Sequence, residues 1–265
     1  MTTGNSAMQL EQGAGWSRGL RNLLRGELSL WFGSRRWLTQ LLLWAAIVDG
    51  ILLAAGLQLP LEQKSEMIMI FNVFLGMAPA VGVAILMMGA VVDEKRSGTA
   101  AWILSKPVSR ISFLLSKLLG NLAGVLVSVV AAQTLIGYLL LRFVGGLNLA
   151  PGRFALGMAA HVINLLFYLT LTLMLGAIFD HPGPVAAISI GFVFTQQYLP
   201  ALLPFLAYVI PYPLFMTYDP SKAQSIAGGW MTGTTPASLL PVFTTLLASL
   251  VFVVVGLWVF QRQEL

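Results

Sequence analysis

The chain has 265 residues, of which 57% are hydrophobic and only 9% are charged, and its formal net charge is +5. A soluble domain carries roughly 25% charged residues, so this composition excludes an ordinary soluble domain and predicts an all-α integral membrane protein. The chain has no cysteine, which excludes disulfides and thiolate chemistry. The basic excess is informative about membrane orientation and does not indicate nucleic-acid binding.

The N-terminal region predicts an amphipathic helix ahead of the first membrane span. The first fifteen residues are polar and lack the pattern of a cleaved signal peptide. In the stretch WSRGLRNLLRGELSLWFGSRR, one helical face carries Arg18, Arg21 and Arg25. The other face carries apolar side chains: Leu20, Leu23, Leu24, Leu28, Trp31 and Phe32. We expect this helix to lie in the inner membrane interface; the alternative is a cytoplasmic extension of span one.

Six segments are apolar for about the 20 residues that a membrane-spanning helix needs. They are residues 37–57, 67–92, 118–141, 154–179, 184–205 and 237–260. We therefore expect one transmembrane domain over residues 1–265, with a cytoplasmic tail and interfacial helix at 1–36, a six-helix membrane domain at 37–260 and a short tail at 261–265.

Basic residues predict the orientation of these spans, since Lys and Arg are enriched in cytoplasmic segments. Eleven of them fall on the side that holds both termini, and four fall on the other side: Lys64, Arg142, Arg153 and Lys222. Both termini are therefore expected in the cytoplasm, in a multi-pass protein of the cell's inner membrane.

The region between spans five and six is expected to form short helices at the outer face. Six prolines interrupt it: Pro200, Pro204, Pro211, Pro213, Pro220 and Pro236. Proline breaks helices, and tyrosine and tryptophan prefer the membrane interface. These helices are expected to sit at, or dip into, the outer interface; the alternative is a plain external loop with an aromatic belt.

The connection between spans two and three, DEKRSGTAAWILSKPVSRISFLLSK, concentrates charge between two apolar spans. Gly98 to Leu104 is long enough for two helical turns, and Pro107 would stop them. Ser109 is expected to cap the helix that leads into span three. Trp102 and its apolar neighbours would be costly to leave in water, and the basic groups favour an acidic partner. These features predict a docking site for a cytoplasmic protein.

The same residues resemble those of ABC-2 type transporter permeases. The resemblance rests on Glu94, on Ser97-Gly98-Thr99, on the run LSKPVSR from Leu104 to Arg110, and on Lys117. The number of spans and the helix before span one extend it over nearly the whole chain. Ala100 and Ala101 stand where the family often has a larger aliphatic residue, which affects only how this short helix packs.

The resemblance implies a coupling helix that fits a groove on a separate ABC ATPase subunit. The residues implied for this contact are Glu94, Gly98, Thr99, Trp102, Leu104, Pro107 and Arg110. The sequence contains no G-x-x-x-x-G-K-[ST] motif, so we expect a non-catalytic chain without a cofactor, with ATP and Mg on the partner. A second permease copy would complete the unit, as a homodimer or a heterodimer.

Polar residues inside the spans are candidates for a translocation path, because ionisable groups there are costly and often functional. They are Asp49, Asn72, Gln196 and Gln197, which lie in spans that by resemblance form the seam between two copies. Asp49 is alternatively a buried group bonded to Gln40, Asn72 or another polar residue. The glutamines serve a polar path or helix packing equally well. A seam with so few polar groups favours amphiphilic or hydrophobic cargo.

Three other features have simpler interpretations. His161 and Asn164 share a helix face and are expected to make packing hydrogen bonds. Methionines cluster in span two, where they fill apolar space or, in a copper-linked branch of the family, bind copper: Met67, Met69, Met77, Met87 and Met88. The run from Asp180 to Pro184 is expected to form a tight cytoplasmic turn.

Three classes of function fit this sequence. The first is an ABC exporter permease in contact with membrane lipids. The second is an ABC permease that acts as a mechanical relay to an outer-face accessory protein. The third is a membrane-embedded enzyme, which is disfavoured because no catalytic constellation or metal-ligand motif occurs.

Overall fold

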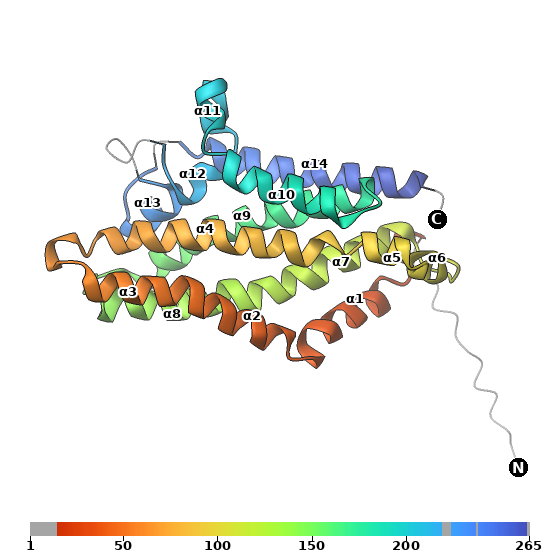
Figure 1. Cartoon of the computed structure of the whole chain (residues 1–265), viewed down its shortest axis with the longest axis horizontal. Coiled ribbons are helices and arrows are strands. Elements are labelled where there is room, and N and C mark those ends of the chain that lie inside the picture. The colour runs from red at the N-terminus through yellow and green to blue at the C-terminus, as the bar shows by residue number, and fades with distance from the viewer. Residues whose placement is uncertain (1–14, 219–223, 237, 264–265) are drawn as a thin grey trace, which may run out of the picture.

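The structure, a computed structural model, describes residues 15–218, 224–236 and 238–263. Predictions that concern residues 1–14, Pro220, Lys222 and the last two residues lie outside this part of the chain. All regular elements in the described residues are helical, and the long ones run side by side along the longest axis of the molecule (Figure 1). The prediction of an all-α membrane protein is confirmed, because five of these helices are long and apolar enough to cross a membrane.

The first and third spans are each interrupted by a π-helical turn. Span one comprises α2 (Arg36–Trp44), a π turn at Ala45–Asp49 and α3 (Gly50–Gln58). Span three comprises α7 (Arg110–Val125), a π turn at Leu126–Ala131 and α8 (Ala132–Phe143). Such turns often mark functional positions in helices, and hydropathy gave no indication of either.

Three further long helices complete the bundle. They are α4 (Glu66–Met88), α9 (Pro151–Ile178) and α14 (Leu240–Arg262). In the most apolar window of α9, 72% of the residues are buried, against 22% for α14. The central position therefore belongs to α9, whereas α14 presents a broad apolar face outward.

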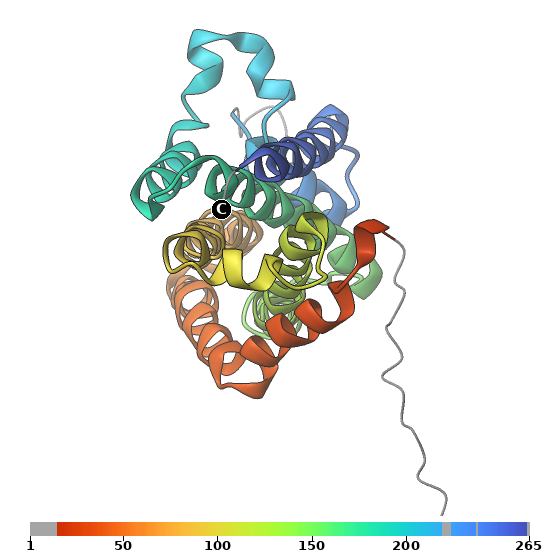
Figure 2. The ribbon, with the colours of Figure 1, turned by 90° about the vertical axis from the view of Figure 1, so that its right-hand side faces the viewer.

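The fifth predicted span differs from the expectation. Its helix, α10 (Pro182–Thr195), has 14 residues, and the chain continues as α11 (Leu199–Leu202) after a break. Fourteen residues rise only about 21 Å, which is shorter than the ~30 Å hydrocarbon core. The α11 segment stands away from the bundle in both ribbon views (Figures 1 and 2). The helix of span five therefore ends about ten residues before the predicted end at 205, and the count of six spans stays a prediction.

Short helices follow α11, as predicted. They include α12 (Tyr212–Phe215) and α13 (Ile226–Thr232). Most residues of α13 are buried, and Met231 packs so closely on α9 that a Cβ at Gly157 would lie 2.4 Å from its Cγ. α13 therefore packs into the helix bundle, while the dip into the outer interface stays a prediction.

The predicted amphipathic helix is α1 (Leu20–Leu28), which continues into a π turn at Ser29–Gly33. It packs against α7, where two glycines leave room for it: a Cβ at Gly120 would lie 2.4 Å from Glu27, and one at Gly124 would lie 2.1 Å from the Trp31 ring. Trp31 is therefore buried in the protein, while Phe32 stays exposed.

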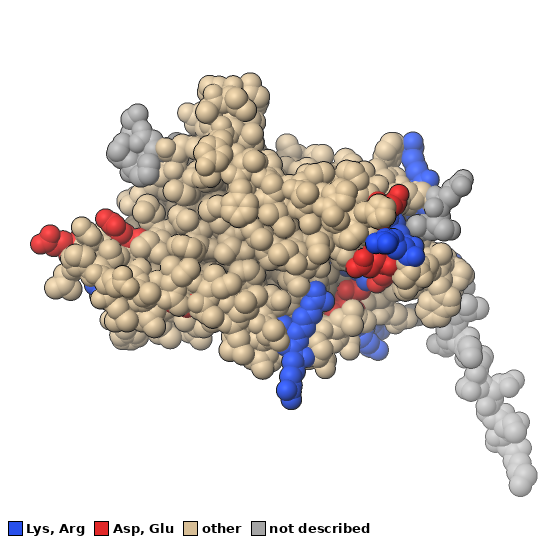
Figure 3. Space-filling view, in the orientation of Figure 1, with Lys and Arg blue, Asp and Glu red and all other residues tan. Residues whose placement is uncertain are grey.

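Charged side chains gather toward the two ends of the bundle and at the corner below α1 and α2, with a broad uncharged band between them (Figure 3). This distribution is typical of a protein that spans a bilayer.

Candidate functional site

The connection between spans two and three folds into two short helices at one end of the bundle. They are α5 (Val92–Arg96) and α6 (Thr99–Leu104), joined at Gly98, whose φ of 73° is left-handed. Glycine adopts this conformation without the cost that a Cβ imposes. The Ser105 hydroxyl donates to the Trp102 carbonyl at 2.8 Å where α6 ends. The prediction of two helical turns is confirmed.

The helix that leads into span three begins as the sequence predicts. Ser109 has extended backbone angles, and its hydroxyl oxygen accepts a hydrogen bond from the Ser112 backbone N–H at 3.0 Å. The Ser109 backbone N–H in turn donates to the Arg18 carbonyl at 3.1 Å. The start of α7 is thereby joined to the segment just before α1.

One face of α6 packs on the bundle and the other faces outward. Ala100 is fully buried, whereas the Trp102 side chain is 63% exposed. The Lys106 ammonium lies 3.3 Å from the centre of the Trp102 ring, a cation–π contact. A large exposed aromatic with a basic group above it is a surface that suits a protein partner.

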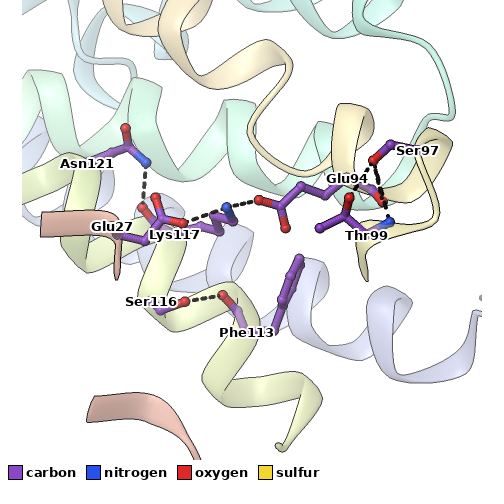
Figure 4. Close-up of polar contacts among 8 residues, drawn as sticks. All are labelled: Glu27, Glu94, Ser97, Thr99, Phe113, Ser116, Lys117 and Asn121. Carbon is purple, nitrogen blue, oxygen red and sulfur yellow. Dashed lines mark hydrogen bonds and ion pairs between the residues drawn. The ribbon is translucent and has the colours of Figure 1, made fainter. Parts of the chain in front are cut away.

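Behind α6, Lys117 of α7 forms ion pairs with two carboxylates (Figure 4). One is Glu27 of α1, at 2.6 Å, and the other is Glu94 of α5. The Lys117 side chain is only 8% exposed. A buried charge is tolerated only when it is paired, so these three residues hold α1, α5 and α7 together.

One turn further along α7, Asn121 makes two hydrogen bonds between uncharged groups. Asn121 donates from Nδ2 to the Lys117 carbonyl at 2.8 Å, and its Oδ1 accepts from the Trp31 indole N–H at 3.1 Å. α1 and the π turn after it are therefore attached to two successive turns of span three, through Glu27 and Trp31.

Lys95 of α5 caps the end of the central helix α9. Its Nζ donates to the carbonyls of Ala177 at 3.2 Å and Phe179 at 2.9 Å, and it pairs with Asp180 at 3.0 Å. The last carbonyls of a helix have no internal partner and carry negative partial charge. A lysine there stabilises the helix end, and it joins α5 to the turn before α10.

Arg110 performs the same role for α14. Its Nη1 donates to the carbonyls of Phe260 at 3.0 Å, Gln261 at 3.0 Å and Gln263 at 2.5 Å. The interpretation that the basic groups of this connection favour an acidic partner is therefore wrong for three of them, because Lys95, Arg110 and Lys117 have partners within the chain.

The residues predicted to contact an ATPase fall into two sets. Gly98, Thr99, Trp102 and Pro107 are exposed, and Leu104 is partly buried beside them. Glu94 turns inward and joins α5 to α7, and Arg110 turns inward and joins the start of α7 to the end of α14. The roles of Glu27 and Lys95 were not predicted from the sequence. For Glu27 a signal existed, since it is the one acidic residue between Glu11 and Asp49.

Asp49, predicted as a path residue or a bonded buried group, lies inside the bundle and is 5% exposed. With the Gln133 amide oriented to satisfy both groups, Gln133 Nε2 donates to Asp49 Oδ1 at 2.9 Å and its oxygen accepts from the Ala45 N–H at 3.3 Å. Gln40, a predicted partner, instead accepts from the Trp44 indole N–H at 3.0 Å. The contact thus joins the π turn of span one to span three.

Asn72 and His161 form a hydrogen bond within the chain, 2.7 Å between Asn72 Oδ1 and His161 Nε2. Asn164 Nδ2 donates to the Gly76 carbonyl at 2.8 Å. The expectation of packing hydrogen bonds from His161 and Asn164 is confirmed, and both join α9 to α4.

The two glutamines after α10 differ in exposure. Gln196 is fully buried, and Gln197 is half-buried. The structure thus places Asn72 and Gln196 inside one copy of the chain, away from its outer surface.

The span-two methionines do not gather into one ligand set. Met67 and Met87 are buried at opposite ends of α4, about 30 Å apart at 1.5 Å per residue, while Met69 is 47% exposed. No group of three His, Cys, Asp or Glu side chains in the described ranges has the spacing of a metal site.

A family model described as ABC-2 family transporter protein matches residues 45–265. The match begins at the π turn of span one and includes the α5–α6 connection and every later helix. Among curated proteins, none matches this chain.

Proposed function

Because the chain belongs to the ABC-2 family of transporter permeases, we propose that this membrane permease subunit exports an amphiphilic or hydrophobic substrate, powered by a separate ABC ATPase that docks on α6. The family implies an ABC ATPase partner in general. The export direction, the cargo class and the docking site are the proposal.

The proposal that an ATPase docks on α6 rests on how α6 is attached to the membrane helices. Trp102 faces outward from α6, while Lys95, Arg110 and Lys117 join the same connection to α9, α14 and α1. A partner that pushed on α6 would therefore move several spans together. This attachment supports a role for α6 in passing force from an ATPase to the bundle.

ATP and Mg belong to the partner in this proposal, because the chain has no P-loop sequence. We place a second permease copy beside the first, both termini in the cytoplasm and the protein in the inner membrane. The distribution of Lys and Arg supports this orientation.

Trp102→Asp is expected to lower the amount of ATPase that co-purifies with the permease by at least about tenfold. The change removes a large apolar contact and would bury a carboxylate at the interface, a penalty of about 1–3 kcal/mol or more. The measurement is the ratio of ATPase to permease after affinity purification from native membranes.

Leu61→Asp is the matched control, since Leu61 is an 88% exposed apolar residue at the opposite end of the bundle. It should leave the ratio unchanged. Unchanged co-purification in Trp102→Asp would refute docking on α6.

The cargo class gives a separate expectation for the reconstituted complex. ATP turnover should rise with lipid-like or drug-like amphiphiles, and Gln197→Leu should shift the half-stimulating concentration by less than about tenfold without dissociating the complex. Gln197 is chosen because it is half-buried, so its loss disturbs the bundle little. Stimulation by a metal or alkali ion alone would contradict an amphiphilic cargo.

A further inference from the structure

A pocket of about 230 Å³ lies between α4, α12 and α13. Two of the helices that line it, α12 and α13, lie toward the end of the bundle opposite to α5 and α6 (Figure 1). Its walls belong to a single copy of the chain, so neither an ATPase nor a second permease is needed to form it.

The walls of this pocket are mainly apolar. Ile68, Met69, Phe215 and Met216 provide apolar surface, and the other described lining residues are neutral. A charged ligand would therefore lose its hydration without gaining an opposite charge, which is costly. The described lining accordingly selects a neutral ligand.

Asn72 is the one buried polar side chain in the described lining of the pocket, since the lining serines, threonines and Gln224 are partly or fully exposed. The Asn72 amide accepts from His161 and donates one N–H to the Ile68 carbonyl at 2.8 Å. Its second N–H has only the Met231 sulfur at 3.7 Å, and a thioether is a weak acceptor. Asn72 is 1% exposed, so this N–H is nearly without a partner in a buried position.

Gly228 leaves the space in front of that donor open. It lines the pocket, and a Cβ built on it would lie 3.7 Å from Asn72 Nδ2. A ligand oxygen can reach the Asn72 N–H through this space.

The depth of the pocket fits an amphiphile. Asn72 lies six residues into α4, about 9 Å from the helix end. Met69, one turn nearer that end, is 47% exposed on the apolar surface of the bundle. A polar head can thus lie at Asn72 while an apolar chain extends past Met69.

We propose that this pocket binds one neutral amphiphile, whose carbonyl or hydroxyl oxygen accepts a hydrogen bond from Asn72 Nδ2. Binding at this site does not depend on the proposed docking of an ATPase on α6, because all its described lining residues belong to one copy of the chain.

The test uses the full chain in phosphatidylcholine nanodiscs and a monoacylglycerol that carries a diazirine near its ester. Labelling should saturate with probe concentration and should map by mass spectrometry to residues 65–72, 212–218 and 224–232. Gly228→Ala should reduce it roughly fivefold, the value of one hydrogen bond, because its methyl blocks the Asn72 donor. Gly191→Ala should not, since a Cβ at Gly191 meets open space.

A second pair of variants tests the same pocket without changing Gly228. Met69→Trp narrows the pocket and should also reduce labelling, whereas Ile85→Trp adds the same ring at a 51% exposed position elsewhere on α4 and should not. A phosphate-headed analogue of the probe should label the pocket weakly. Three results would overturn the proposal and indicate bulk lipid contact. Labelling could rise without saturation, it could be equal for the two head groups, or it could be unchanged in both Gly228→Ala and Met69→Trp.

Discussion

Lys117→Met is expected to destabilise the folded chain by about 3–5 kcal/mol, the cost of breaking a buried ion pair by removing one partner. The change leaves Glu27 and Glu94 facing each other without the ammonium that joins them. The thermal midpoint of the detergent-solubilised chain should fall on the order of 10 °C. Fluorescence-detected size-exclusion chromatography after heating measures it.

The control for this change is Lys106→Met. Lys106 is exposed, so its replacement should alter the stability by less than about 0.5 kcal/mol. Adding Glu27→Gln and Glu94→Gln to Lys117→Met should restore most of the midpoint, because the two uncompensated charges are then gone. A full effect without rescue would mean that Lys117 stabilises the bundle by packing and not by charge.

Gly98→Pro should abolish co-purification of the ATPase while leaving the chain inserted in the membrane. Proline fixes φ near −65°, whereas Gly98 has a φ of 73°. It also removes the Gly98 backbone N–H that donates to the Lys95 carbonyl at 3.2 Å. The orientation of α6 relative to α5 would change, and Trp102 would point elsewhere. Pull-down from membranes, normalised to inserted permease, measures the effect.

Gly146→Pro imposes a comparable backbone conflict at the other end of the bundle. Gly146 has a φ of 66°, and open space surrounds the position of its Cβ, as at Gly98. ATPase binding should persist in this variant if the chain still inserts. Equal losses in both variants would show that general misfolding, and not the direction of α6, explains the result at Gly98.

The sequence was sufficient for features that depend on residues close together in the chain. Long apolar runs predict membrane helices because each helix satisfies its own backbone hydrogen bonds. The end of α6 after Leu104 depends on the nearby Pro107, because proline disfavours the helical conformation in the residue before it. The start of α7 depends on the side chain of Ser109, which caps the helix. The family resemblance in the α5–α6 connection is local in the same sense, and the family match confirms it.

Hydropathy could not reveal where a span breaks. Residues 184–205 are mostly apolar and carry no charge, yet α10 ends at Thr195 and α11 leaves the bundle. Mean hydropathy measures transfer into lipid, but the course of the backbone also depends on prolines and on the space that neighbouring helices leave.

The partners of the buried polar groups were decided only by tertiary structure. Lys95 and Arg110 cap helices whose ends lie more than 80 residues away in the chain, and the partner of Asn72 is 89 residues away. Every helix end presents the same free backbone carbonyls, whatever its sequence. The residues around a lysine therefore do not predict which helix end it will bind. Helix packing brings these groups together, and the high cost of an unpaired polar group in an apolar interior then selects the pairs.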